Sequence, residues 1–257
     1  MLFIALVFGL CFGSFANVII YRVPIGLSII KPSSRCPVCE KKIKATELIP
    51  VLSWLILRGK CSVCRAKIPT RYPVIEITCA LLFAAIFAFS PLDAVIPLVL
   101  LVFILLCVSV IDFDTQTIPD GLLIFGASVG VVWVMNGILF PNIAYSSPNL
   151  TKAALGIFAG GAPLLLLDKI SLFVYGRDGF GYGDVKLMAM VGIFIGWREI
   201  FIAFFFAFVL GGLTAIALVV LKKIKRGQYM PFGPFLALGS LISLWFGEII
   251  INAYFGI

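Results

Sequence analysis

The chain has 257 residues, of which 62% are hydrophobic and 12% charged, and its mean hydropathy of +1.16 excludes an ordinary soluble domain. Its net charge of +8 does not indicate nucleic-acid binding, because the basic residues lie between apolar runs, where the positive-inside rule explains them. The absence of histidine excludes Ser-His-Asp and Cys-His catalysis, which leaves carboxylates, a lysine-assisted serine, or a metal held by Cys, Asp and Glu for hydrolysis.

Apolar runs of spanning length follow one another along the chain. An α-helix needs about 17 to 25 mostly apolar residues to cross a lipid bilayer. Such runs lie near residues 2–21, 73–90, 94–111, 121–139, 152–168, 199–221 and 232–255. A shorter run from Asp184 to Trp197 is either a short span or the first part of the longer run behind it. The pattern predicts an all-α polytopic membrane protein with about eight transmembrane helices.

The positions of lysine and arginine predict how these spans are oriented. If a tight hairpin turns near Trp197, 18 of the 20 basic residues lie on one side of the membrane, and Lys152 and Arg198 lie on the other. This asymmetry favours eight spans, with the basic side in the cytoplasm and both termini outside. No basic residue precedes Arg22, which argues against a cleaved signal peptide.

The hydrophilic segment 22–72 separates the first two spans and is expected to form a small cytoplasmic domain. It contains two C-x-x-C pairs, separated by 21 residues, whose members are Cys36, Cys39, Cys61 and Cys64. This spacing is typical of a zinc knuckle or ribbon, whereas a redox pair is disfavoured in a reducing cytosol. Four thiolates complete a tetrahedral zinc and leave no position for water, so we expect a structural zinc that compensates for a small core.

A first acidic string, at 111–120, lies where the third span is expected to reach the cytoplasm. Asp112 falls near a helix C-terminus, where an anion opposes the helix dipole and is destabilising unless it has a function. Asp120 follows a proline and is expected to be an N-cap. Asp114 is either a solvated loop residue or a residue that supports the active site. Asp112 is therefore the functional candidate of this string.

A second string, at 179–186, approaches the next helix on the same predicted side. Asp184 opens this helix, where the helix dipole and the nearby Lys186 favour its negative charge. Glycines, which tolerate conformations closed to other residues, precede it at Gly179, Gly181 and Gly183. We hypothesise that Asp112 holds a shared proton while Asp184 activates water.

Together these strings resemble the type IV prepilin peptidases, the GxGD-type aspartic peptidases of bacterial inner membranes that also act as N-methyltransferases. The matching pieces are GSFANVIIYRVP at 13–24, the two cysteine pairs, IP at 49–50, SWL at 53–55, LRGKC at 57–61, RYP at 71–73 with Glu76, IDFDTQTIPD at 111–120 and GYGDVK at 181–186. Their order and approximate spacing extend over the length of the chain, which makes the resemblance specific.

The resemblance implies that Asp112 and Asp184 form the catalytic pair. It also implies that the substrates are type IV prepilins or pseudopilins, cut on the cytoplasmic side after a basic leader, and that S-adenosylmethionine then methylates the new N-terminal amine. By motif match, Gly59 marks the cytoplasmic region on which methylation depends. No Gly-rich motif of the common methyltransferase fold accompanies it.

The expected organisation is a first transmembrane helix at 1–21, a zinc-binding four-cysteine domain at 22–72, and a membrane aspartic peptidase domain of about seven helices at 73–257. Two other functions remain open. Carboxylates in membrane helices also serve proton- or ion-coupled transporters. A non-enzymatic membrane scaffold, whose zinc domain binds a partner, is the second alternative.

Overall fold

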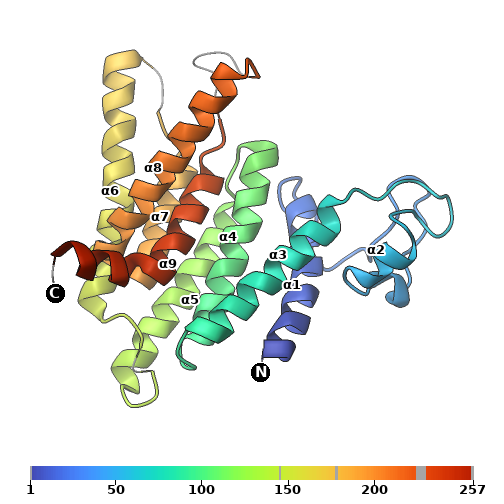
Figure 1. Cartoon of the computed structure of the whole chain (residues 1–257), viewed down its shortest axis with the longest axis horizontal. Coiled ribbons are helices and arrows are strands. Elements are labelled where there is room, and N and C mark those ends of the chain that lie inside the picture. Colours follow the sequence, from blue (N-terminus) through green and yellow to red (C-terminus); the bar gives the residue numbers. More distant parts are fainter. Residues whose placement is uncertain (1, 145, 177–178, 224–229, 256–257) are drawn as a thin grey trace. The chain divides into compact units, whose positions relative to one another are not determined.

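Helices are the only extended regular elements in the computed structural model, which describes residues 2–144, 146–176, 179–223 and 230–255. Arg177, Lys225 and Arg226, which contribute to the predicted charge asymmetry, lie outside the described residues. The helices are α1 (Leu2–Arg22), the 3-10 helix η1 (Ala45–Leu48), α2 (Leu52–Ile56), α3 (Arg71–Phe89), α4 (Val95–Thr115), α5 (Asp120–Leu139), α6 (Leu150–Tyr175), α7 (Tyr182–Ile195), α8 (Trp197–Val220) and α9 (Gly233–Phe255) (Figure 1). The predicted all-α class is confirmed.

Seven of the described helices are long and apolar enough to cross a membrane, namely α1, α3, α4, α5, α6, α8 and α9. The chain is therefore a multi-pass membrane protein, as the hydropathy pattern predicts. The eighth predicted span is α7, whose 14 residues make it shorter than the others. At about 1.5 Å per residue it extends about 21 Å, less than the roughly 30 Å of a hydrocarbon core. Gly196, with a φ of +86°, ends α7 before α8 begins, so the short run is a separate helix.

The chain folds as two compact units, Met1–Val95 and Ile96–Ile257. In the first unit, α1 and α3 pack closely because small residues face the partner backbone. A Cβ atom added to Gly13 would lie 2.6 Å from the Cα atom of Glu76. The hydrophilic segment between the two helices carries two isolated β-bridges, Arg35 with Lys42 and Lys60 with Lys67.

The short helix α7 lies at the centre of the second unit, where it packs against α5, α6, α8 and α9. Gly156 of α6 and Gly192 of α7 face each other so closely that a Cβ atom on either would overlap the other's carbonyl group. Most of the α7 side chains are buried by these neighbours. Because protein surrounds it, α7 need not match the thickness of the lipid.

Candidate active site and candidate metal centre

Asp112 lies in the last turn of α4, and its side chain is 4% exposed. Its Oδ2 atom accepts a hydrogen bond of 2.8 Å from the backbone N–H of Gly233, the first residue of α9. The C-terminal carbonyls of α4 disfavour an anion here, whereas the N-terminus of α9 favours one. The two helix ends therefore have opposite effects on the Asp112 carboxylate. The N-terminus of α9 compensates for the unfavourable position of this charge at the C-terminus of α4.

Gly233 allows this contact because it has no side chain. A Cβ atom at this position would lie 2.8 Å from Oδ2 of Asp112 and 3.1 Å from its Cβ and Cγ atoms. The sequence pattern does not assign Gly233 a role, although a glycine directly before Pro234 at the start of an apolar run is an available signal. Any side chain at this position must displace the Asp112 carboxylate or the start of α9.

Asp184 occupies the first turn of α7, where its N–H donates to the carbonyl oxygen of Gly181, the N-cap residue. Its side chain is also 4% exposed. The Oδ1 atom is buried and receives no hydrogen bond from the residues that the structure describes. The carboxylates of Asp184 and Asp112 lie close enough to repel each other electrostatically. The structure therefore brings the two predicted aspartates together at one end of the second unit.

The glycine-rich approach to α7 is closely packed. A Cβ atom on Gly183 would lie 2.9 Å from Cβ of Ile118, in the loop after α4. A Cβ atom on Gly179 would lie 2.7 Å from Cβ of Ser171, in α6. Neither glycine has a positive φ, so lack of space explains these two glycines better than conformational freedom does. Gly181 has a φ of −74°, which any residue can adopt.

Lys186 pairs with Asp120 and not with Asp184, although Asp184 is much closer to it in the sequence. Its Nζ atom lies 2.8 and 2.9 Å from the two carboxylate oxygens of Asp120 and so connects α7 to α5. Asp120 is the first residue of α5, whereas Pro119 is the N-cap, so the expected N-cap is wrong by one residue. Asp114 is exposed at the end of α4, and its supporting role stays a prediction.

Asp168 of α6 is a buried carboxylate that the sequence reasoning does not single out. Its Oδ1 atom accepts hydrogen bonds from the backbone N–H groups of Gly179 (3.1 Å) and Phe180 (3.3 Å). The available signal is the presence of a charged residue inside an apolar run.

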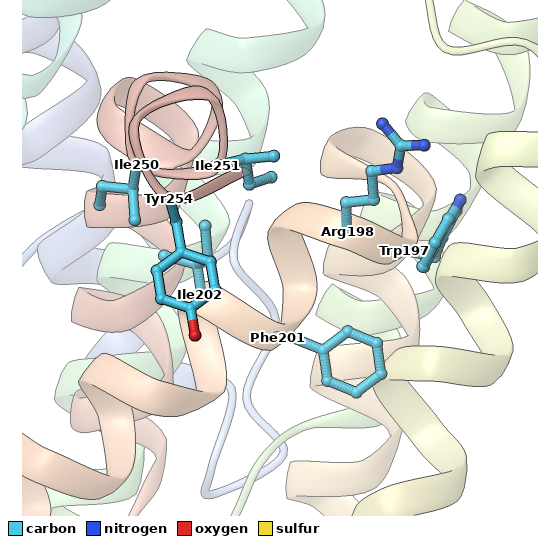
Figure 2. Close-up of a pocket in the computed structure, with 7 residues that line it drawn as sticks. All are labelled: Trp197, Arg198, Phe201, Ile202, Ile250, Ile251 and Tyr254. Carbon is cyan, nitrogen blue, oxygen red and sulfur yellow. The ribbon is translucent and has the colours of Figure 1, made fainter. Parts of the chain in front are cut away.

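A cavity of about 450 Å³ lies at the opposite end of the second unit from the aspartates. It is formed by the start of α8, including Trp197 and Arg198, and the end of α9, including Ile250 and Tyr254 (Figure 2). Ile250 lies 17 residues after Gly233 in the same helix, or about 26 Å along its axis. The cavity is therefore separate from the candidate active site.

The four cysteines of the first unit form a candidate metal centre. The Sγ atoms of Cys36, Cys39, Cys61 and Cys64 all lie within 4.8 Å of one another, so together they can hold a metal ion. The two C-x-x-C turns are closed in the same way. The backbone N–H of the first cysteine in each turn donates to a carbonyl oxygen five residues later, that of Lys41 in one turn and that of Ala66 in the other.

Backbone hydrogen bonds also favour the thiolates that metal binding requires. The N–H groups of Cys39 and Val38 lower the pKa of the Cys36 thiol to about 6. The N–H groups of Val63 and Cys64 likewise lower the pKa of Cys61. The N–H of Ala66 lowers the pKa of Cys64, but desolvation and the neighbouring cysteine side chains outweigh it and raise that pKa to about 11. Thiolates in these positions and a compact set of four sulfur donors fit a metal ion that prefers sulfur.

Gly59 lies beside the second cysteine pair and has a φ of +65°. A Cβ atom there would lie 2.8 Å from Cζ2 of Trp54, whose indole N–H donates to the carbonyl oxygen of Ile68. Ile68 in turn donates its N–H to the carbonyl oxygen of Gly59. Gly59 thus holds the Trp54 ring against the loop, while its link to methylation stays a prediction.

Known proteins resemble this chain over nearly its whole length. A protein of Stutzerimonas stutzeri named prepilin leader peptidase/N-methyltransferase is 34% identical, over 97% of this chain and 92% of its own. A protein of the same name from Bacillus subtilis (strain 168) is 35% identical, over 99% of this chain and 98% of its own. The chain belongs to the type IV leader peptidase family. No solved structure matches it.

Two family models match this member of the type IV leader peptidase family. The model of the bacterial peptidase A24 N-terminal domain matches residues 7–89, which include the four cysteines. The model of the type IV leader peptidase family matches residues 98–216, which include Asp112 and Asp184. The resemblance inferred from the motifs is confirmed.

Proposed function

We propose that this protein is an aspartic endopeptidase that removes the leader peptide of type IV prepilins or pseudopilins, with Asp112 and Asp184 as its catalytic pair. The observation that carries the proposal is the meeting of these two buried carboxylates at the ends of α4 and α7. The names of the relatives support this reaction. The absence of histidine leaves carboxylates as the best-placed acid and base.

In the proposed reaction, one water molecule is split across the pair. One carboxylate of the pair is ionised and accepts a proton from the water, while the other is protonated and donates to the carbonyl oxygen of the scissile peptide. The N–H of Gly233 favours the ionised form of Asp112, whereas Oδ1 of Asp184 is buried without a donor among the described residues. These contacts support Asp112 as the base and Asp184 as the acid, the reverse of the roles hypothesised from the sequence. Attack on the carbonyl carbon gives a tetrahedral intermediate, and its collapse breaks the C–N bond while a proton passes to the leaving amine. No covalent enzyme intermediate is required.

The charge pattern supports cleavage on the cytoplasmic side of a bacterial inner membrane. Eleven of the 20 basic residues lie in the hydrophilic segment 22–72, which the positive-inside rule assigns to the cytoplasm. The bond to be cut lies between a basic leader and an apolar segment. A site at a membrane boundary suits such a substrate, because the apolar segment remains in lipid while the leader stays in water.

We also propose that Cys36, Cys39, Cys61 and Cys64 bind a structural zinc ion. Four sulfur donors complete a tetrahedral zinc, so the ion would stabilise the small hydrophilic segment without an open position for chemistry. Metal analysis of the purified protein is expected to give about one zinc per chain. Substoichiometric zinc in fully folded protein would contradict this assignment.

The same protein is proposed to methylate the new N-terminal amine with S-adenosylmethionine, since the relatives are named for both activities. A single experiment tests both steps. Purified protein is incubated with a model prepilin, with and without S-adenosylmethionine, and the product masses are measured. We expect leader loss in both samples and an added methyl group only with the methyl donor. An uncleaved prepilin, or proton movement in vesicles instead of cleavage, would contradict the proposal and favour the transporter alternative.

A further inference from the structure

A buried carboxylate outside the catalytic pair, Asp168, has an unusual position. Its side chain is 2% exposed and lies inside α6, seven residues before the helix ends at Tyr175. A carboxylate within a membrane-spanning helix is unfavourable unless hydrogen bonds or a function compensate for it. Asp168 lies outside the motifs that carry the family resemblance.

The hydrogen bonds of Asp168 hold the segment that leads to Asp184. Both the N–H of Gly179 and the N–H of Phe180 donate to the same oxygen, Oδ1. Phe180 is followed directly by Gly181, the N-cap of α7, and Asp184 lies in the first turn of that helix. A displacement of this two-residue segment therefore moves the start of α7.

The surrounding contacts dock the same segment on α6. Gly179 lies against Ser171, with no room for a Cβ atom. Lys169, the neighbour of Asp168, reaches the hydroxyl oxygen of Tyr182 at 3.4 Å. Three residues near the C-terminal end of α6, Asp168, Lys169 and Ser171, thus contact the approach to α7 or its first residue.

The side chain of Phe180 connects this segment to the other aspartate. Its ring packs edge-on against Phe208 of α8 at 6.0 Å and against Phe232 at 5.4 Å between centroids. Phe232 directly precedes Gly233, whose N–H holds Asp112. The segment anchored by Asp168 therefore contacts the supports of both catalytic candidates.

We propose that Asp168 is a positioning residue that fixes the Gly179–Phe180 segment and so maintains the relative placement of Asp184 and Asp112. The inference rests on the proposed peptidase function. The ring contacts of Phe180 hold its side chain, whereas the two hydrogen bonds to Asp168 hold the backbone of both residues. Hydrogen bonds to a carboxylate are about twice as strong as neutral ones, so these two bonds add substantially to the rigidity of the segment. Placement matters, since a misplacement of about 1 Å can lower a reaction rate roughly 100-fold.

Three substitutions at this position separate the roles of acceptor, charge and placement. Asp168→Ala removes the acceptor and is expected to lower kcat about 10- to 100-fold with little change in KM, because the catalytic groups move but substrate binding does not. Asp168→Asn retains an acceptor oxygen without the charge and is expected to stay within about fivefold of the wild-type kcat. Asp168→Glu keeps the charge but moves the oxygens by one methylene group, and kcat is expected to fall as in the alanine variant.

Ser243→Ala is the matched control. It also removes a hydrogen bond of a buried side chain, from the Ser243 hydroxyl to the carbonyl oxygen of Glu199, but at the other end of the second unit. Its kcat per folded molecule is expected to equal that of the wild type. A comparable loss in this control would assign the effect of Asp168 to general destabilisation and would overturn the inference.

Amide hydrogen exchange at Gly179 and Phe180 provides a readout that does not depend on cleavage. Exchange is expected to be faster in Asp168→Ala and near the wild-type rate in Asp168→Asn. Unchanged kcat and unchanged exchange in the alanine variant would overturn the inference, as would an asparagine variant as impaired as the alanine variant. If Asp168→Ala does not fold, a glutamate variant with the wild-type kcat would refute it. If even the wild type does not cleave prepilin, the proposed function fails, and amide exchange still decides whether Asp168 fixes the segment.

Discussion

Substitution of Gly233 by alanine tests how the position of Asp112 is maintained. The new Cβ atom would lie 2.8 Å from Oδ2 and 3.1 Å from the Cβ and Cγ atoms of Asp112. Ordinary van der Waals separation requires that the carboxylate or the start of α9 retreat by about half an ångström or more. The same movement stretches the 2.8 Å hydrogen bond from the Gly233 N–H.

The expected loss follows from this geometry. A hydrogen bond to a charged group contributes about 1.5 to 3 kcal/mol, and a shift of catalytic groups approaching 1 Å lowers a rate by up to about 100-fold. We therefore expect Gly233→Ala to lower kcat for prepilin cleavage about 10- to 100-fold, measured by mass spectrometry under saturating substrate.

Gly212→Ala is the matched control for this measurement. Gly212 lies in α8, and a Cβ atom there would meet nothing within 4 Å. Alanine is favoured over glycine in a helix by about 0.5 to 1 kcal/mol, so this variant is expected to be at least as stable as the wild type and equally active. A Gly233→Ala variant with wild-type kcat would refute the reasoning that Asp112 depends on this close contact.

Three further predictions concern the rest of the molecule. Gly59→Ala places a methyl group 2.8 Å from Trp54 and is expected to reduce methyl transfer while cleavage continues. Gly26→Ala is the control, because Gly26 has a similar φ of +70° but no atom within 4 Å of an added Cβ, and it is expected to reduce neither methyl transfer nor cleavage. Lys186→Met removes the ion pair between Lys186 and Asp120, whose side chains are 52% and 59% exposed, so the free energy of unfolding is expected to fall by at most about 1 kcal/mol. Cleavage is expected to persist, and a tenfold loss of kcat would instead assign Lys186 to the active site. The lowered pKa of Cys36, about 6, keeps that thiolate present at neutral pH, whereas the raised pKa of Cys64 means that a proton must leave when metal binds. Protons therefore compete with the metal, so bound metal, measured after dialysis, is expected to be retained at neutral pH and lost on acidification; metal that stays bound at every acidic pH would contradict this.

The membrane helices are largely predictable because lipid makes hydropathy a local signal. The predicted runs at 73–90 and 121–139 coincide within two residues with α3 and α5. The run after Asp184 was ambiguous, because hydropathy alone does not show whether a short apolar segment ends or continues. The backbone of Gly196, at a φ of +86°, ends it.

The cysteine centre is predictable for a similar reason. A C-x-x-C turn is a local structure, and a second pair at a suitable distance supplies the remaining donors. The four sulfur atoms lie within 4.8 Å of one another, as the spacing suggests. What the spacing does not reveal is the close packing of Trp54 against Gly59.

The supports of the aspartate pair depend on contacts between distant parts of the chain. Asp112 and Gly233 are 121 residues apart, and Lys186 pairs with Asp120 across 66 residues. Helix dipoles and charges near in sequence describe Asp112 and Asp184 individually, but packing decides which donors reach them. Asp168 shows the same limit, since its burial in α6 is foreseeable whereas its two backbone donors are not.

Substitution of the two aspartates tests the central claim most directly. Asp112→Asn and Asp184→Asn each retain the shape of the side chain but remove its ability to exchange a proton. The measurement is the mass of a model prepilin after incubation with each purified variant, beside a synthetic peptide with the mature N-terminus and S-adenosylmethionine. We expect the prepilin to remain uncut by both variants while the mature peptide is still methylated. Normal leader removal by either variant would contradict the assignment of Asp112 and Asp184 as the catalytic pair.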